Sequence, residues 1–248
     1  MKVTLSAPCH FGLESVLSSE IRRMGGENVQ VTDGRVTFDG DENLIARSNI
    51  GLRTAERVQL VLGRFEARSF EELFQGVKAL PWEDLLKRED QFPVTGSCLS
   101  SQLHSVPDCQ AIVKKAIVER LKAQYRLSWF PETGSLHRVR FRILKDQVSV
   151  MVDTSGEGLH KRGYRALSND APMKETLAAS LGQLSRLRPD GHLIDPFCGS
   201  GTLLVEGALL ALRIAPGLQR TFTAQTWTNV PKALWQQERD RARSLERR

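Results

Sequence analysis

One segment of this chain restricts its fold more than any other: an apolar stretch that ends in a glycine turn and is followed by a helical pattern. Residues 192–202 read His-Leu-Ile-Asp-Pro-Phe-Cys-Gly-Ser-Gly-Thr, and an apolar run follows from Leu203 to Ile214. This pattern predicts a buried strand whose carboxyl end leads into a helix N-terminus. The glycines let the backbone approach a ligand closely, and the helix dipole favours a carboxylate or phosphate there. An α/β arrangement is therefore expected for this part of the chain.

Three kinds of ligand site share this geometry, and the residues discriminate between them. A P-loop requires Gly-Lys-Ser/Thr, which the turn lacks, and a dinucleotide site requires Gly or Ala where this chain has Leu204. The remaining ligand is the methionine part of S-adenosylmethionine. Asp195, at the end of the expected strand, is suited to bind its ammonium group. A glycine turn that only connects strand to helix is the alternative without a ligand. Glu206 lies either near the ligand or at the surface as an ordinary helix carboxylate.

The positive charge of the chain is concentrated in one stretch. The sequence has 35 Lys and Arg against 29 Asp and Glu, a net charge of +6. Residues 120–165 hold ten basic and four acidic residues, so this stretch alone carries an excess of six. Such an excess favours a polyanionic partner such as RNA, with Trp129 or Tyr164 available for stacking. A solvated basic face is the alternative.

The residues before this turn predict short strands alternating with helices. From Val3 to Ile50 the pattern is strand, helix, hairpin, helix, and Ser69 is expected to cap a later helix. Residues 139–143 and 148–152 alternate with period two and predict a hairpin with one buried face. Arg140 and Arg142 then point outward together.

Other features limit the class of protein. Glycines and Pro172 break the pattern over 155–172, which predicts a domain boundary there. The four cysteines lack zinc-site spacing, so no metal is expected. No secretory signal follows Met1, and the most apolar stretch is too short to span a bilayer, so a cytoplasmic protein without a membrane segment is expected. Tryptophans 82, 227 and 235 are expected to pack in the interior.

Two strings of residues carry a resemblance to a known family. Asp195–Thr202 is similar to the first motif of class I S-adenosylmethionine-dependent methyltransferases that modify exocyclic amines. Residues 153–165 and 171–179 resemble the junction in THUMP-domain methyltransferases. The chain most resembles the family that methylates guanine N2 in large-subunit ribosomal RNA, members of which are often labelled N6-adenine-specific DNA methylases.

The resemblance implies an α+β N-terminal half followed by the start of an α/β Rossmann-like methyltransferase domain. The expected boundaries are a ferredoxin-like unit over 1–54, a THUMP RNA-binding module over 55–154, a linker over 155–172, and a partial methyltransferase domain over 173–248. The implied cofactor is S-adenosylmethionine and the implied partner is structured ribosomal RNA. The oligomeric state stays open.

The resemblance and the charge pattern assign individual residues to the cofactor and to the RNA. The implied cofactor-binding residues are Lys174, Asp195, Pro196, Phe197, Cys198, Gly199, Ser200, Gly201 and Thr202. The RNA-binding residues are expected to be Arg138, Arg140, Arg142, Lys145, His160, Lys161, Arg162, Tyr164 and Arg165.

One departure from the family limits the assignment. Family members continue into an acidic residue that holds the cofactor ribose and then an Asn/Asp-Pro-Pro-Tyr segment that binds the target amine. This chain contains no Pro-Pro pair, so no catalytic residue is assigned within it. We expect a fragment, a truncated form or one product of a split gene. A noncatalytic RNA-binding chain and an adenine-N6 DNA methyltransferase remain as alternatives.

Overall fold

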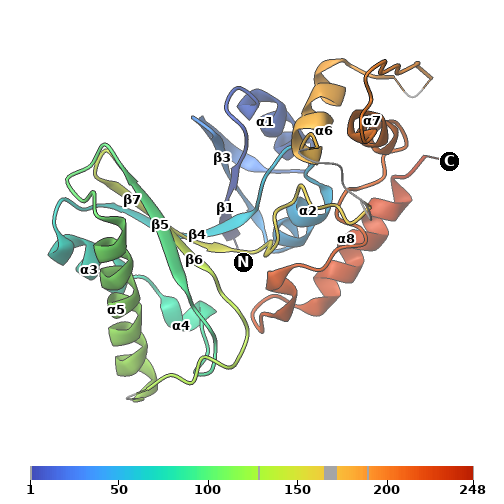
Figure 1. The fold of residues 1–248 in the computed structure, drawn as a ribbon. Coiled ribbons are helices and arrows are strands. Elements are labelled where there is room, and N and C mark those ends of the chain that lie inside the picture. Colours follow the sequence, from blue (N-terminus) through green and yellow to red (C-terminus); the bar gives the residue numbers. More distant parts are fainter. Residues whose placement is uncertain (1, 128, 165–171, 189, 248) are drawn as a thin grey trace. The chain divides into compact units, whose positions relative to one another are not determined.

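The computed structural model describes residues 2–127, 129–164, 172–188 and 190–247 (Figure 1). The contacts divide the chain into two compact units. Unit 1 contains residues 1–58, 154–225 and 230–248, and unit 2 contains residues 59–153 and 226–229. Both units are therefore built from segments that are not contiguous in the sequence.

The first part of unit 1 has the predicted order of strand, helix, hairpin and helix. Its elements are β1 (Lys2–Pro8), α1 (Glu14–Arg23), β2 (Glu27–Thr32), β3 (Arg35–Asp41) and α2 (Asn43–Gly51). The three strands are antiparallel in the order β2-β3-β1. Leu5 and Phe38 are paired across β1 and β3 and fully buried, as are Leu17 and Ile21 of α1. The periodic apolar residues of the sequence thus form this core.

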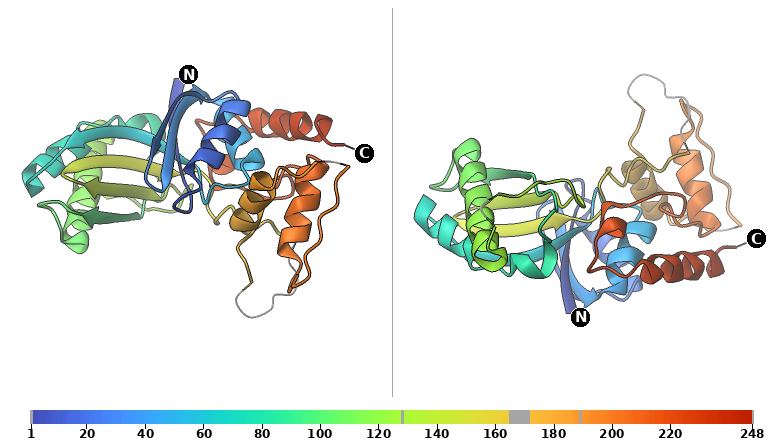
Figure 2. Two further views of the ribbon diagram at one scale, coloured as in Figure 1. Left: turned by 90° about the horizontal axis from the view of Figure 1, so that it is seen from above. Right: turned by 90° about the horizontal axis from the view of Figure 1, so that it is seen from below.

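The second part of unit 1 is helical. It contains α6 (Glu175–Leu184), α7 (Thr202–Ala211), a 3₁₀ helix (Thr223–Thr226) that ends in unit 2, and α8 (Lys232–Ser244). Helices α6 and α7 lie side by side (Figure 2). The predicted helix after the glycine turn is confirmed as α7.

The strand predicted over residues 192–195 is wrong for this structure. These residues have no regular secondary structure, and Ile194 is 82% exposed. A buried strand requires hydrogen-bonding neighbours on its edges. The described residues between 172 and 247 contain no strand that supplies them.

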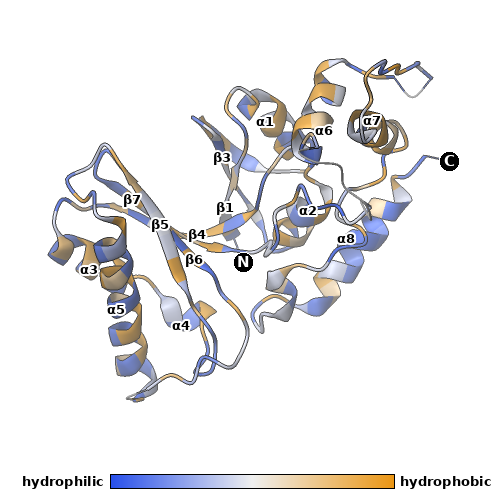
Figure 3. Ribbon diagram, in the orientation of Figure 1, coloured by the Kyte–Doolittle hydropathy of each residue, from blue (hydrophilic) through white to orange (hydrophobic). Residues whose placement is uncertain are grey.

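Helix α8 is hydrophilic along most of its length (Figure 3), yet it packs against α2. Trp235 is buried and stacks on Phe222 with ring centroids 5.4 Å apart. Glu238 is 2% exposed and accepts hydrogen bonds from Nε and Nη2 of Arg47 at 2.9 and 2.7 Å. These bonds to Glu238 raise the pKa of Arg47. An ion pair between a buried carboxylate and a half-buried guanidinium therefore helps to hold a helix that lacks a broad apolar face.

Unit 2 is a four-stranded sheet with its main helices on one side. Its elements are β4 (Gln59–Glu66), α3 (Phe70–Lys78), α4 (Trp82–Leu85), β5 (Val94–Leu99), α5 (Val106–Tyr125), β6 (Val139–Leu144) and β7 (Gln147–Asp153). The strand order is β4-β7-β6-β5, with β5 and β6 parallel and the other pairs antiparallel. Helices α3 and α5 lie together against one face of this sheet (Figure 1).

Two local predictions for unit 2 are confirmed. Ser69 caps α3 through a full capping box with Glu72. The β6–β7 hairpin forms in antiparallel register, and Phe141 and Ile143 are buried while Arg140 is exposed. The period-two alternation of the sequence therefore reports the two faces of the strand correctly.

None of the helices in the described part of the chain is both long enough and apolar enough to cross a membrane.

Candidate functional site

The glycine turn before α7 forms an open loop at a helix N-terminus. Gly199 and Gly201 have φ angles of +53° and +71°, a region that side-chain-bearing residues rarely occupy. A Cβ built on either glycine meets no atom within 4 Å. Gly201 is the N-cap of α7, and no side chain caps the helix there. The backbone therefore presents a free, positively polarised helix end.

Asp195 lies at the entrance of this turn. Its Oδ1 accepts a hydrogen bond from the backbone N–H of Phe197 at 3.1 Å, which fixes the carboxylate beside the loop. Ser200 and Thr202 share a hydrogen bond between their hydroxyls at 3.0 Å. The turn joins a carboxylate, which attracts an ammonium group, to a helix end, which attracts a carboxylate. These residues fit the aminocarboxylate end of S-adenosylmethionine.

Lys174 lies at the same end of the helix pair as this turn. It is the N-cap of α6, and Gly201 is the N-cap of α7. The last turns of both helices line one cavity, through Gly182 and Leu210, so the two helices run in the same direction. Their N-termini therefore lie at the opposite end together.

Lys174 belongs to a cluster around Glu56 that the sequence did not reveal. The Thr176 hydroxyl donates to Oε1 of Glu56 at 2.5 Å. The Glu56 carboxylate also lies 3.3 Å from Nε2 of His10, 3.5 Å from Nδ1 of His160 and 3.7 Å from Nζ of Lys174. The partners come from three separate segments of unit 1, around His10, His160 and residues 174–176, so no local spacing signals the cluster.

Burial and neighbouring positive charges have opposite effects on the pKa of Glu56. Burial opposes its ionisation, but the Thr176 hydrogen bond and the neighbouring cations outweigh that cost and lower the pKa of Glu56. Burial lowers the pKa of His160, although the same carboxylate favours its protonation. Glu56 is therefore an ionised anchor that positions the N-terminus of α6.

The structure corrects the RNA-binding assignment of Arg162. This residue is 5% exposed, and its Nη1 and Nη2 donate to the carbonyls of Leu159 and Arg53 at 2.6 and 2.5 Å. Its Nε donates to Glu206 at 3.3 Å. Since each guanidinium nitrogen is bound inside the protein, Arg162 is a structural residue. Glu206 is 1% exposed, so it is not a surface carboxylate.

Tyr164 shares the same buried carboxylate. Its hydroxyl donates to Oε1 of Glu206 at 3.0 Å, and burial together with that carboxylate raises the pKa of Tyr164. The residue remains 39% exposed, which leaves part of its ring accessible for stacking. Lys161 is exposed and pairs with Glu157 at 3.2 Å. Arg165 lies outside the described residues.

The basic residues of the hairpin form a separate group in unit 2. Arg138, Arg140 and Arg142 alternate along one face of β6 and its approach, and Lys145 lies in the β6–β7 turn. Arg138, Arg140 and Lys145 are exposed, and Arg142 is half-buried. Thr95 and Ser97 of β5 are the register partners of Arg140 and Arg142. This face, which we call the arginine strip (Arg138, Arg140, Arg142), has the charge to contact a phosphate backbone.

Comparison with family models divides the chain into three parts. Residues 4–59 match the RlmL ferredoxin-like domain, residues 67–153 match the THUMP domain, and residues 162–247 match the RMKL-like methyltransferase domain. The glycine turn lies in the third part, and the arginine strip lies in the second.

Individual relatives match almost the whole chain. The "Putative RNA methyltransferase YpsC" of Bacillus subtilis is 47% identical over 240 residues, which is 96% of this chain and 62% of the relative. A predicted N6-adenine-specific DNA methylase from Listeria monocytogenes has 48% identity and a TM-score of 0.96, covering 99% of this chain and 65% of that one. A putative methyltransferase, SMU.472, complexed with SAH has 43% identity and a TM-score of 0.93, with the same coverage.

The chain thus spans slightly less than two thirds of the length of these relatives. Its three domain matches nevertheless follow one another in order and account for most of its residues. The chain therefore combines, in this order, segments that match the RlmL ferredoxin-like, THUMP and RMKL-like methyltransferase domains, an arrangement consistent with a THUMP-domain methyltransferase.

Proposed function

We propose that a protein carrying this chain transfers a methyl group from S-adenosylmethionine to the exocyclic N2 of a guanine in large-subunit ribosomal RNA. The observation that carries the proposal is the open glycine turn at the N-terminus of α7, with Asp195 at its entrance. That the same chain also matches a THUMP domain supports an RNA substrate.

The cofactor supplies an electrophilic methyl group when it is bound. In this chain, the Asp195 carboxylate would hold its ammonium group, and the backbone amides after Gly201 would hold its carboxylate. Gly199 would let the backbone lie close to the ligand. The SAH complex of the relative SMU.472 supports this choice of cofactor.

The arginine strip would hold the RNA through its backbone. Its guanidinium groups suit phosphate oxygens, and such contacts carry affinity rather than sequence preference. Trp129 is 71% exposed and would add stacking on an unpaired base. The name of YpsC, "Putative RNA methyltransferase", supports RNA, whereas that of the Listeria monocytogenes relative names a DNA methylase, and the THUMP match favours RNA between them.

The choice of guanine N2 depends on the resemblance of Asp195–Thr202 to methyltransferases of exocyclic amines. Transfer to such an amine requires its lone pair in line with the methyl group and exclusion of water. We assign no residue of this chain to the target base. Its contribution would be to position the cofactor and the RNA backbone.

Methyl transfer tests the proposal directly. Labelled S-adenosylmethionine would be supplied with unmodified large-subunit ribosomal RNA or with duplex DNA, and the modified base identified by mass spectrometry. Asp195→Asn removes the charge that would hold the ammonium group, and Asp190→Asn is the matched control, because Asp190 is exposed and lies outside the turn.

The expected result is N2-methylguanine in the RNA, lost in Asp195→Asn and retained in the control. Label in adenine of duplex DNA would instead assign the protein as a DNA methylase. RNA binding without any cofactor binding would make it a noncatalytic RNA-binding protein. Equal activity of both variants would remove Asp195 from the cofactor site.

A further inference from the structure

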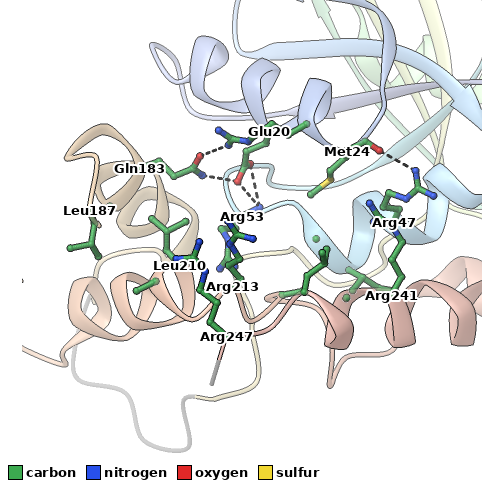
Figure 4. Close-up of a pocket in the computed structure, with 18 of the residues that line it drawn as sticks. Glu20, Met24, Arg47, Arg53, Gln183, Leu187, Leu210, Arg213, Arg241 and Arg247 are labelled. Carbon is green, nitrogen blue, oxygen red and sulfur yellow. Dashed lines mark hydrogen bonds between the residues drawn. The ribbon is translucent and has the colours of Figure 1, made fainter. Parts of the chain in front are cut away.

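A cavity of about 600 Å³ lies within unit 1, and its lining comes from the C-terminal parts of five helices and from residues that follow them (Figure 4). Helices α1, α2, α6, α7 and α8 contribute, and seven arginines line the cavity against two carboxylates, Glu20 and Glu238. The glycine turn is at the other end of α7, about 15 Å away for a helix of this length. The cavity is therefore separate from the candidate cofactor site.

Part of this positive charge has a structural role. Arg47 pairs with Glu238. Arg53 donates through Nη2 to the carbonyls of Leu209 and Ile214 at 3.1 and 2.7 Å, which closes the C-terminal end of α7. Each helix C-terminus carries roughly half a negative charge, so five of them contribute about −2.5. When this charge and the two carboxylates are subtracted from the seven arginine charges, an excess of about +2.5 remains.

Of the remaining five arginines, Arg241 lies 3.6 Å from the Glu238 carboxylate that Arg47 also binds, and the other four have no anionic partner among the described residues. Arg23 donates to the neutral side chain of Gln183 at 3.0 Å. The side chains of Arg186, Arg213 and Arg247 are exposed at the rim and form no ion pair within the part of the chain that the structure describes. A dianionic ligand would balance this excess.

Arg53 carries a buried charge that the described residues satisfy only in part. It is 8% exposed, and its Nη1 has no hydrogen-bond partner among the described residues. A buried guanidinium donor without an acceptor is costly, and native structures normally satisfy such groups. Arg53 lines the cavity in Figure 4, so its guanidinium adds to the positive charge of the cavity wall.

The rest of the lining fits an organic group beside the anion. Met24, Ile50, Leu187, Leu210 and Leu245 contribute apolar side chains to the wall. Arginine forks recognise phosphate oxygens in pairs, and apolar walls suit a sugar and a heterocycle. The volume lies within the range of small-molecule sites.

We propose that this cavity binds the terminal phosphate of a nucleotide, either a free nucleoside monophosphate or the 5′-phosphorylated end of an RNA chain. This site goes beyond methyl transfer and does not rest on it. A terminal phosphate carries close to two negative charges, as the unbalanced arginines require. Its heterocycle would lie against the apolar wall.

Calorimetry with AMP, adenosine and inorganic phosphate tests the proposal on the whole chain. The test variant is Arg213→Gln/Arg247→Gln, because neither side chain holds another residue of the described chain. The matched control is Arg22→Gln/Arg188→Gln, which removes the same charge outside the cavity. Circular dichroism would establish that both variants are folded.

The expected result is binding of AMP without binding of adenosine, weakened at least about tenfold in the test variant and unchanged in the control. Equal binding of adenosine and AMP, equal loss in both variants, or binding of neither AMP nor 5′-phosphorylated RNA would each overturn the proposal. Comparison of 5′-phosphorylated with 5′-hydroxyl RNA distinguishes the two sources. Preference for the phosphorylated RNA over AMP assigns the RNA end, and equal affinity for the two assigns the free nucleotide.

Discussion

The indole of Trp227 stacks on the imidazole of His137, with ring centroids 4.5 Å apart and planes inclined by 17°. The indole N–H donates to the carbonyl of Leu136 at 3.0 Å, and the Ser135 hydroxyl donates to the carbonyl of Thr226 at 2.9 Å. Both rings are almost fully buried. Residues 226–229 are therefore part of unit 2, although they follow α7 in the sequence.

Replacement of Trp227 should destabilise unit 2. Trp227→Ala removes a buried aromatic side chain and leaves a cavity beside His137, a change that typically costs about 3–5 kcal/mol. Trp129→Ala is the control, because Trp129 is 71% exposed, and its effect should stay within about 0.5 kcal/mol. Amide hydrogen exchange of β6 and β7 would measure the effect. Equal protection in the two variants would contradict a structural role for the stack.

The stability of unit 2 should decrease as the pH falls below about 6.5, the pKa of an unfolded histidine. Burial lowers the pKa of His137 in the folded protein, although Asp90 opposes this. Its Nδ1–H donates to the carbonyl of Ser135, and no described residue forms a hydrogen bond with the buried Nε2. Below about pH 6.5 the unfolded chain therefore binds more protons than the folded chain. The contribution of neutral His137 to stability is retained only above that pH.

The variant His137→Asn isolates this contribution, because it removes the titrating group and keeps a side-chain N–H. Chemical denaturation between pH 5 and 7 should show a flatter pH dependence for the variant than for the unaltered chain. An NMR titration of His137 would report its pKa directly. A value at or above 6.5 would refute the explanation.

Arg162 and Glu206 should each be needed for stability because each compensates the buried charge of the other. Glu206→Gln leaves a buried guanidinium without its counter-ion, and such losses cost about 3–5 kcal/mol. The double variant Arg162→Met/Glu206→Leu removes both charges and should recover much of that loss. A double-mutant cycle would measure the coupling, and additive single effects would contradict it.

Neutralisation of the arginine strip should weaken RNA binding and reduce its salt dependence. Arg138→Gln/Arg140→Gln removes two exposed charges, so the slope of log K against log salt should fall by about 1.4–1.8. The control Lys78→Gln/Lys115→Gln removes two charges from α3 and α5, on the other face of the sheet. Filter binding at several salt concentrations measures the slope. An equal decrease in the control would indicate only a general charge effect.

Local sequence signals predicted much of this fold. The capping box at Ser69 and the hairpin of β6 and β7 depend on neighbouring residues, so a short window contains all the information needed. The glycine turn belongs to the same class, because Gly199 and Gly201 occupy φ angles that favour glycine. The expectation that Trp82, Trp227 and Trp235 are buried is confirmed as well.

The glycine turn and most of the elements before it could thus be predicted from sequence, since they depend on residues close together in the chain. The burial of individual charges could not be predicted in this way, because it depends on contacts between distant segments. Arg162 was expected in an RNA-binding group, but its partners Arg53 and Glu206 come from segments 109 and 44 residues away. The cluster at Glu56 and the arginine cavity are decided in the same way, because the free energy of a charge depends on the groups that folding brings to it.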